Sequence, residues 1–181
     1  MKIIPDSSFF ICFLDDLEGH LQITDRLRVL TMITGNYPVM VVPAVEQESR
    51  FQRLPTVISN QIQRITITGL PTDPSIELLR PLLGKGEHEV ITFARTCLSN
   101  GDSTFLFILD DGVARNLVKR ILPALVSHMK GTVGFLGYCA LQKVLDKNGT
   151  IQLLTAIGKS KFRVDQSTIS IVITEVHNRC I

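Results

Sequence analysis

Residues 104–111 read Thr-Phe-Leu-Phe-Ile-Leu-Asp-Asp, an apolar run that ends abruptly in two carboxylates. A strand that is apolar at successive positions is typical of the centre of a parallel sheet, where both faces are covered. Residues 2–5 and 39–42 are predicted to form two further short strands, and each is followed by residues that favour a helix start. Strands that alternate with helices predict a three-layer α/β/α fold with a central, mainly parallel sheet.

Two kinds of pattern predict helices between and after these strands. Apolar residues recur three or four positions apart, or a capping residue type stands directly before an apolar run. These patterns predict helices over 9–16, 23–33, 43–50, 75–83, 87–98, 112–117 and 133–145. Residues 72–75 would cap the helix over 75–83, and residues 148–149 would end the helix over 133–145. Residues 54–64 fit a helix or a loop, and 65–67 a short strand. Residues 168–176 fit a strand or a helix, and we favour a helix because its apolar residues would share one face.

The bulk composition is that of an ordinary globular protein and does not by itself indicate a partner. The chain has 181 residues, of which 45% are apolar and 20% charged, and its net charge is +2. This size predicts one domain over residues 1–181, with 151–181 as a C-terminal extension that packs on it. The longest apolar run is far shorter than the ~20 residues that cross a bilayer, so no membrane partner is expected. The four cysteines are Cys12, Cys97, Cys139 and Cys180, and they form no CxxC pair. This pattern predicts reduced thiols and a cytoplasmic location.

Acidic residues follow the predicted strands or begin the predicted helices. Asp6 ends the first strand, Glu46 and Glu48 follow the second, Glu87 starts a helix, and Asp110-Asp111 ends the central strand. In a parallel sheet these junctions share one edge, where carboxylates would repel one another unless a cation lay among them. Oxygen ligands suit Mg²⁺ or Mn²⁺, and such ions promote phosphodiester cleavage. Taken singly, however, an aspartate at a helix start is more often a cap, and Glu46 is more often a solvated side chain.

These segments resemble the motifs of PIN-domain nucleases. Ile-Ile-Pro-Asp-Ser-Ser resembles their first strand and acidic residue, and Val-Pro-Ala-Val-Glu-Gln-Glu their second motif, in which Glu48 matches the glutamate better than Glu46. Lys-Gly-Glu-His-Glu-Val-Ile resembles the third motif of a prokaryotic subgroup that has Gly-Glu where many members have an aspartate. Five such segments occur in order over about residues 1–150, at 3–11, 42–48, 85–94, 107–115 and 130–136.

The resemblance implies a Mg²⁺- or Mn²⁺-dependent endoribonuclease, with RNA as substrate. Such proteins are often toxins of toxin–antitoxin pairs and often homodimers, which implies an antitoxin protein and a second copy as partners. The catalytic residues implied are Asp6, Glu48, Glu87, Asp110 and Asp111, and the metal ligands Asp6, Glu87, Asp110 and Asp111. Of the adjacent pair, Asp111 fits the motif slightly better. The departure from the common pattern is Glu87, whose longer side chain would shift the ion.

Several polar residues near these carboxylates are candidates for substrate contacts. Ser7, Ser8 and Thr132 can orient a phosphate or the waters of a metal, although helix capping explains them equally simply. Arg115 and Lys119 lie one helical turn apart after the acidic pair and can meet a phosphate, although exposed basic residues are usually only solvated. No basic groove is evident from the sequence, and the histidines lack metal-ligand spacing.

Two alternatives to an RNA-cleaving enzyme stay open on the sequence. A non-catalytic PIN-like module that binds RNA or protein is compatible with Glu87 and with the nearly neutral charge. A flap-endonuclease-like DNA enzyme would need additional DNA-gripping elements, for which the chain is short. The sequence lacks GxSxG, Walker A and GxGxxG motifs, which argues against a hydrolase elbow or a nucleotide-binding loop.

Overall fold

A five-stranded sheet, in which every strand pairing is parallel, forms the centre of the computed structural model, which describes residues 1–67 and 73–180. The strand order is β3-β2-β1-β4-β5. The strands are β1 (Lys2–Pro5), β2 (Val39–Val41), β3 (Ile62–Arg64), β4 (Phe105–Ile108) and β5 (Met129–Lys130). Strand β1 therefore lies between β2 and β4, with Ile4 opposite Phe107. Because β1 and β4 are buried along almost their whole length, the central position predicted for 104–109 is confirmed.

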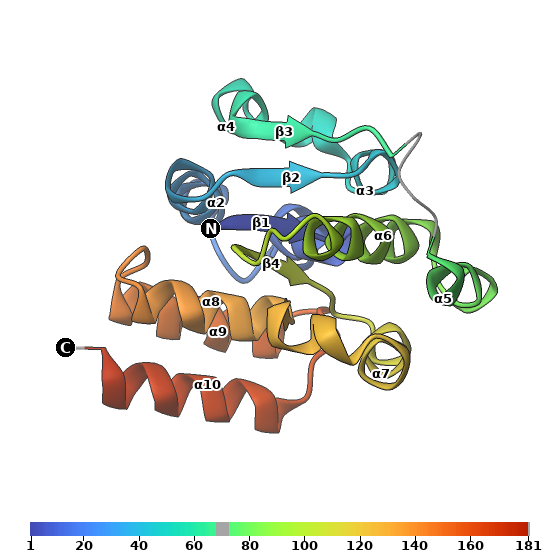
Figure 1. Cartoon of the computed structure of the whole chain (residues 1–181). Coiled ribbons are helices and arrows are strands. Elements are labelled where there is room, and N and C mark those ends of the chain that lie inside the picture. The colour runs from blue at the N-terminus through green and yellow to red at the C-terminus, as the bar shows by residue number, and fades with distance from the viewer. Residues whose placement is uncertain (68–72, 181) are drawn as a thin grey trace.

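Helices cover both faces of this sheet and complete the three-layer α/β/α fold predicted from the sequence (Figure 1). Helix α6 (Lys85–Ser99) packs on β1 and β4, and in Figure 1 it lies in front of them. Helices α8 (Thr132–Leu141), α9 (Lys147–Lys159) and α10 (Gln166–Arg179) pack on one another on the β4 side. The remaining helical segments are α1 (Ser7–Ile11), η1 (Cys12–Asp16), α2 (Ile23–Asn36), α3 (Pro43–Glu48), η2 (Phe51–Arg53), α4 (Thr56–Gln61), α5 (Pro74–Glu77), η3 (Arg80–Leu82), α7 (Gly112–Ile121) and η4 (Pro123–His128).

A cluster of aromatic side chains fixes the chain directly after β1. The ring of Phe9 meets those of Phe10, Phe13 and Phe135 at centroid distances of 5.2, 5.3 and 6.0 Å. All four side chains are buried in one continuous core that runs from Ile3 to Val176. The core thus joins α1 to α8 and includes the C-terminal helix. That residues 1–181 form a single domain stays a prediction.

The segment after α1 is a π-helix that is held by a buried arginine. Arg26 of α2 is 5% exposed, and its Nη1 donates to the carbonyl oxygens of Phe13 at 2.9 Å and Leu14 at 3.3 Å. Carbonyl groups in the last turn of a helical segment have no partner within the helix, so an external donor satisfies those of Phe13 and Leu14. Arg26 therefore ties α2 to the segment that follows Asp6.

Within the described residues, no helix is long and apolar enough to cross a membrane. The four cysteines are free thiols, as predicted; three are buried, and Cys180 is partly exposed.

Several predicted boundaries are wrong, and the errors have physical causes. The short strand lies at 62–64 rather than 65–67, because Val41 pairs with Arg64; residues 56–61 before it are helical. Predicted helix 75–83 divides into α5 and η3, while the part of its cap before residue 73 lies outside the described residues. The helix predicted over 133–145 ends at Leu141 instead of 145. Residues 148–149 do not stop a helix but lie inside α9, which begins because Asp146 accepts the N–H of Gly149 at 2.7 Å.

The aromatic cluster yields a first prediction. Phe9→Ala removes a side chain that is 1% exposed and leaves a cavity beneath α1, so we expect the free energy of unfolding to fall by about 3–5 kcal/mol. Ile171→Ala, at a side chain that is 67% exposed, is the matched control and should change it by less than about 0.5 kcal/mol. Chemical denaturation followed by circular dichroism measures both, and equal losses would contradict the assignment of Phe9 to the core.

Candidate metal and active site

Asp6 lies at the carboxyl edge of the sheet, between the two central strands. Its N–H donates to the carbonyl of Ile108 at 3.0 Å, which continues the pairing of β1 with β4. The side chain is 1% exposed: Oδ1 accepts the N–H of Phe9 at 3.1 Å, and Oδ2 accepts the N–H of Asp110 at 3.0 Å. In open α/β sheets, ligands bind at the point where the strand order reverses, which here is the junction of β1 and β4.

Asp110 is held by the residues that follow β5. Its Oδ1 accepts the N–H of Thr132 at 2.8 Å and its Oδ2 accepts the Thr132 hydroxyl at 2.5 Å. Gly131 makes room for this contact, since a Cβ there would lie 3.0 Å from both Asp110 Oδ1 and Arg115 Nη1. Arg115 donates from Nη1 to the carbonyl of Leu109 at 3.0 Å. Asp110 and Arg115 are thereby fixed side by side.

Asp111 has a different local role from its neighbour. It is exposed, and its Oδ1 accepts the N–H of Ala114 at 2.7 Å, so it caps α7. Of the pair, Asp110 is the one that contacts Asp6, although the motif comparison slightly favoured Asp111. Both carboxylates nevertheless line the same hollow.

Glu87 and Glu48 meet at the N-terminus of α6. Glu87 Oε2 accepts the N–H of Gly84 at 2.5 Å, and Glu48 Oε1 accepts the N–H of Gly86 at 3.3 Å. A Cβ on Gly86 would lie 2.6 Å from Glu48 Oε2, so the glycine permits this approach. Glu46 points elsewhere and pairs with Arg64 of β3 at 2.6 Å. The structure therefore places Glu48, and not Glu46, beside Glu87.

Carboxylates that are far apart in the sequence repel one another at this edge of the sheet. Burial and the charge of Asp110 raise the pKa of the Asp6 carboxyl well above its usual value, and Glu87 adds to the shift. Burial also raises the pKa of Asp110, against the opposing effects of Thr132 and Arg115. Burial raises the pKa of Glu87 as well, with contributions from Asp111 and Glu48. A carboxyl group whose pKa is raised in the folded state costs stability when it is ionised at neutral pH.

The donor set fits a hard divalent cation, although the side chains do not converge on one point. Within 1–67 and 73–180, no group of three or more His, Cys, Asp or Glu side chains is arranged to hold an ion. Each candidate carboxylate instead accepts a backbone N–H, which leaves further lone pairs free for a metal. The nearby Cys12 is a buried thiol whose pKa is raised well above its usual value by burial and by Asp110. Carboxylate oxygens are therefore the ligands on offer, and they suit Mg²⁺ or Mn²⁺.

Two adjoining hollows open at this edge and bring in residues that the sequence reasoning missed. The first is lined by Ser8, Asp16, Glu87, Asp110, Asp111, Lys161, Phe162 and Arg163, among others. The second is lined by Asp110, Arg115, Gly131, Arg163, Asp165 and Thr168, among others. Three cations line these hollows, whereas no basic groove was evident from the sequence. Of the predicted substrate contacts, Arg115 lines the second hollow and Thr132 holds Asp110, whereas Ser7 and Lys119 line neither.

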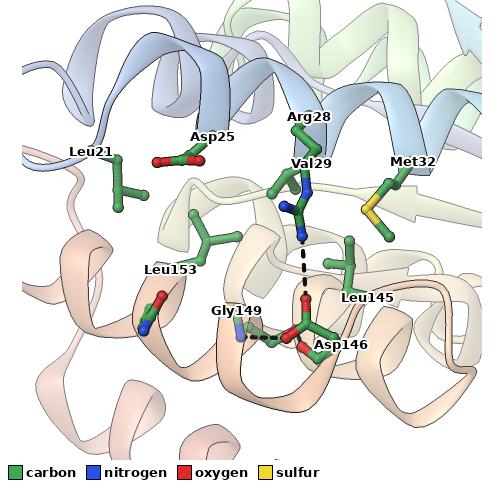
Figure 2. A pocket seen from close by; sticks show the side chains of 11 residues that line it. Leu21, Asp25, Arg28, Val29, Met32, Leu145, Asp146, Gly149 and Leu153 are labelled. Atoms are coloured by element: carbon green, nitrogen blue, oxygen red, sulfur yellow. Dashed lines mark hydrogen bonds and ion pairs between the residues drawn. The ribbon is translucent and has the colours of Figure 1, made fainter.

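A third, smaller hollow lies between α2 and α9, away from the carboxylates discussed above (Figure 2). Leu21, Val29 and Leu153 contribute apolar side chains, and Arg28 lies 3.7 Å from Asp146. Asp25, the other acidic residue that lines this hollow, lies on the exposed surface of α2. None of the residues predicted to be catalytic lines it, so we assign it no role in catalysis.

Comparison with known proteins identifies the family. A family model described as DUF3368, a PIN domain, matches residues 19–178. The chain therefore belongs to the PIN-domain family, as the resemblance of its motifs implied, while the prokaryotic subgroup stays a prediction. The match includes Glu48, Glu87, Asp110 and Asp111 and begins after Asp6. No curated protein and no solved structure matches the chain. PIN domains are generally nucleases and typically use divalent metals.

Electrostatic repulsion at this edge leads to a second prediction. Asp110→Asn removes one charge beside Asp6 and keeps the contacts with Thr132, since the amide oxygen accepts its N–H and the amide nitrogen donates to its hydroxyl. In EDTA at pH 7, we expect the free energy of unfolding to rise by about 1 kcal/mol. With Mn²⁺ the difference in unfolding free energy between the two proteins should shrink, because bound cation stabilises the unaltered protein.

Denaturation of the two proteins with and without Mn²⁺ measures this difference. Asp25→Asn on the exposed surface of α2 is the control and should change stability by less than about 0.5 kcal/mol. An Asp110→Asn protein that is less stable than the unaltered one in EDTA would show that the charges do not repel as described.

Proposed function

We propose that this PIN domain is a Mg²⁺- or Mn²⁺-dependent endoribonuclease. The observation that carries the proposal is that carboxylates from separate segments lie at one edge of the sheet, near enough to shift one another's pKa. Asp6 follows β1, Glu48 ends α3, Glu87 starts α6, and Asp110-Asp111 follows β4. Asp110 and Glu87 raise the pKa of Asp6, and Asp111 and Glu48 raise the pKa of Glu87, so the edge concentrates negative charge that a divalent cation would neutralise.

Each residue in the proposed site has a distinct role. Asp6, Glu87, Asp110 and Asp111 would hold the cation, and Glu48 adds negative charge at the start of α6. The bound cation would polarise the phosphodiester and promote attack by water. Thr132 fixes the orientation of Asp110 through two hydrogen bonds, and Arg115 presents a guanidinium beside it for a phosphate oxygen. Ser8 lines the hollow and offers a hydroxyl group to the substrate.

A non-catalytic PIN-like module that binds RNA or protein is the second candidate. The observation that favours it is the engagement of every candidate carboxylate with a backbone N–H, with no formed metal cluster among the described residues. On this alternative, the aspartates are helix caps that hold the sheet edge together. Cleavage of RNA above the level of a carboxylate variant would eliminate it.

The nuclease proposal predicts the behaviour of Asp6→Asn. Loss of a proposed metal ligand should lower Mn²⁺-dependent cleavage of mixed single-stranded RNA by about 100-fold or more, because transition-state stabilisation of several kcal/mol is lost. Asp25→Asn is the matched control and should cleave like the unaltered protein. Gel assays of labelled RNA, with circular dichroism to verify folding, measure both. Undiminished cleavage by Asp6→Asn would eliminate the mechanism.

We also propose that the enzyme is the toxin of a toxin–antitoxin pair and forms a homodimer. Exposed apolar side chains support a protein partner: Leu78 is 73% exposed and Leu82 60% exposed, on neighbouring segments before α6. Sedimentation of the purified protein, alone and with the product of any adjoining small reading frame, tests both parts. A monomer that binds no such product would contradict them.

A further inference from the structure

The loop between α9 and α10 brings a basic pair to the carboxylates. Lys161 and Arg163 are exposed, whereas Phe162 between them is 8% exposed and packs in the core. The loop is fixed on its N-terminal side by Ser160, whose Oγ donates to the carbonyl of Ile157 at 2.8 Å and accepts the N–H of Phe162 at 3.1 Å. Phe162 thus anchors a short segment that presents a cation on each side of it.

This pair lines the same hollows as the proposed catalytic residues. Lys161 and Arg163 both line the hollow that contains Glu87 and Asp111. Arg163 also lines the second hollow, together with Arg115. The two hollows share Asp110, Gly112 and Arg163, so they adjoin at Asp110, and each has a volume of about 480 Å³. That volume lies within the usual range for small-ligand sites.

Among the described residues, the basic side chains of these hollows form no ion pair with the acidic side chains around them. Acidic side chains that face these hollows are Asp16, Glu87, Asp110, Asp111 and Asp165. Across the part of the chain that the structure describes, Arg115, Lys161 and Arg163 make no ion pair within 4 Å with any of these. Lys161 and Arg163 thus line a hollow with carboxylates and stay available for a ligand that carries negative charge beside a metal.

We propose that the two hollows form one groove for single-stranded RNA, in which Lys161 and Arg163 hold successive backbone phosphates next to the phosphodiester at Asp110. This inference rests on the proposed function and deepens it, because it assigns two substrate-binding residues to the C-terminal part of the chain. Arg163 lies where the hollows join and contacts the phosphate nearest the carboxylates. Lys161 contacts a phosphate farther along the first hollow. Because such contacts are made to the backbone, they bind without regard to base sequence.

Salt dependence of RNA binding tests the proposal. Ca²⁺ replaces Mg²⁺, and a gel verifies that a fluorescent single-stranded oligoribonucleotide stays intact during the measurement. For single strands, each phosphate contact contributes about 0.7 to the slope of log K against log salt concentration. Lys161→Gln with Arg163→Gln should therefore flatten the slope by about 1.4 and weaken binding roughly tenfold at 0.1 M salt.

Two further double variants make the result specific. Arg28→Gln with Lys143→Gln removes the same charge from exposed positions outside both hollows and should leave the slope unchanged. Lys161→Arg with Arg163→Lys keeps both charges and should restore the slope. The proposal is overturned if the Lys161/Arg163 glutamine pair binds like the unaltered protein, if the control pair loses as much, or if the unaltered protein binds no RNA. Normal binding without any Mn²⁺-dependent cleavage would contradict the nuclease proposal alone and support the groove.

Discussion

Repulsion between Asp6 and Asp110 is the constraint around which the carboxyl edge of the sheet is built. Both follow the paired central strands, and each is fixed by hydrogen bonds that leave it little room to move away. Folding alone would favour neutral side chains here, because burial and like charge both disfavour ionised carboxyl groups. The fold instead supports this arrangement with backbone donors, with Arg115, and with the aromatic packing of α1. Such a costly cluster is typical of a functional site.

The rest of the molecule can be understood from this edge outward. Parallel pairing aligns the ends of β1 and β4, and the N-termini of α1 and α7 then supply donors to Asp6 and Asp111. Gly131 and Gly86 allow neighbouring side chains to approach, the first for Asp110 and the second for Glu48. Helix α10 packs on α8 and α9, so the loop before it reaches the same hollow. Membership of the PIN-domain family agrees with this arrangement.

Sequence reasoning succeeded where local pattern and packing agree. Residues 3–5 and 105–109 are buried on both faces, and Asp6 caps a helix whose aromatic residues are buried. It failed where strand pairing or helix capping decides the structure. Strand β5 has only two residues, too few to show a pattern, and was not predicted. Asp146 caps α9 and so allows a helix to run through Gly149, which was predicted to end one. Lys161 and Arg163 were missed because tertiary packing, and no motif, brings them to Asp110. The alternating basic, aromatic and basic residues at 161–163 were the available indication.

The central claim is that these carboxylates share a divalent cation, and diffraction from a Mn²⁺-soaked crystal at the manganese absorption edge tests it most directly. The account predicts an anomalous peak at the carboxyl edge between β1 and β4, with oxygens of Asp6 or Asp110 and at least one other acidic residue of the cluster as ligands. The side chains would turn from their present contacts toward the ion. A well-ordered edge without manganese, or manganese bound only at unrelated surface residues, would contradict the account.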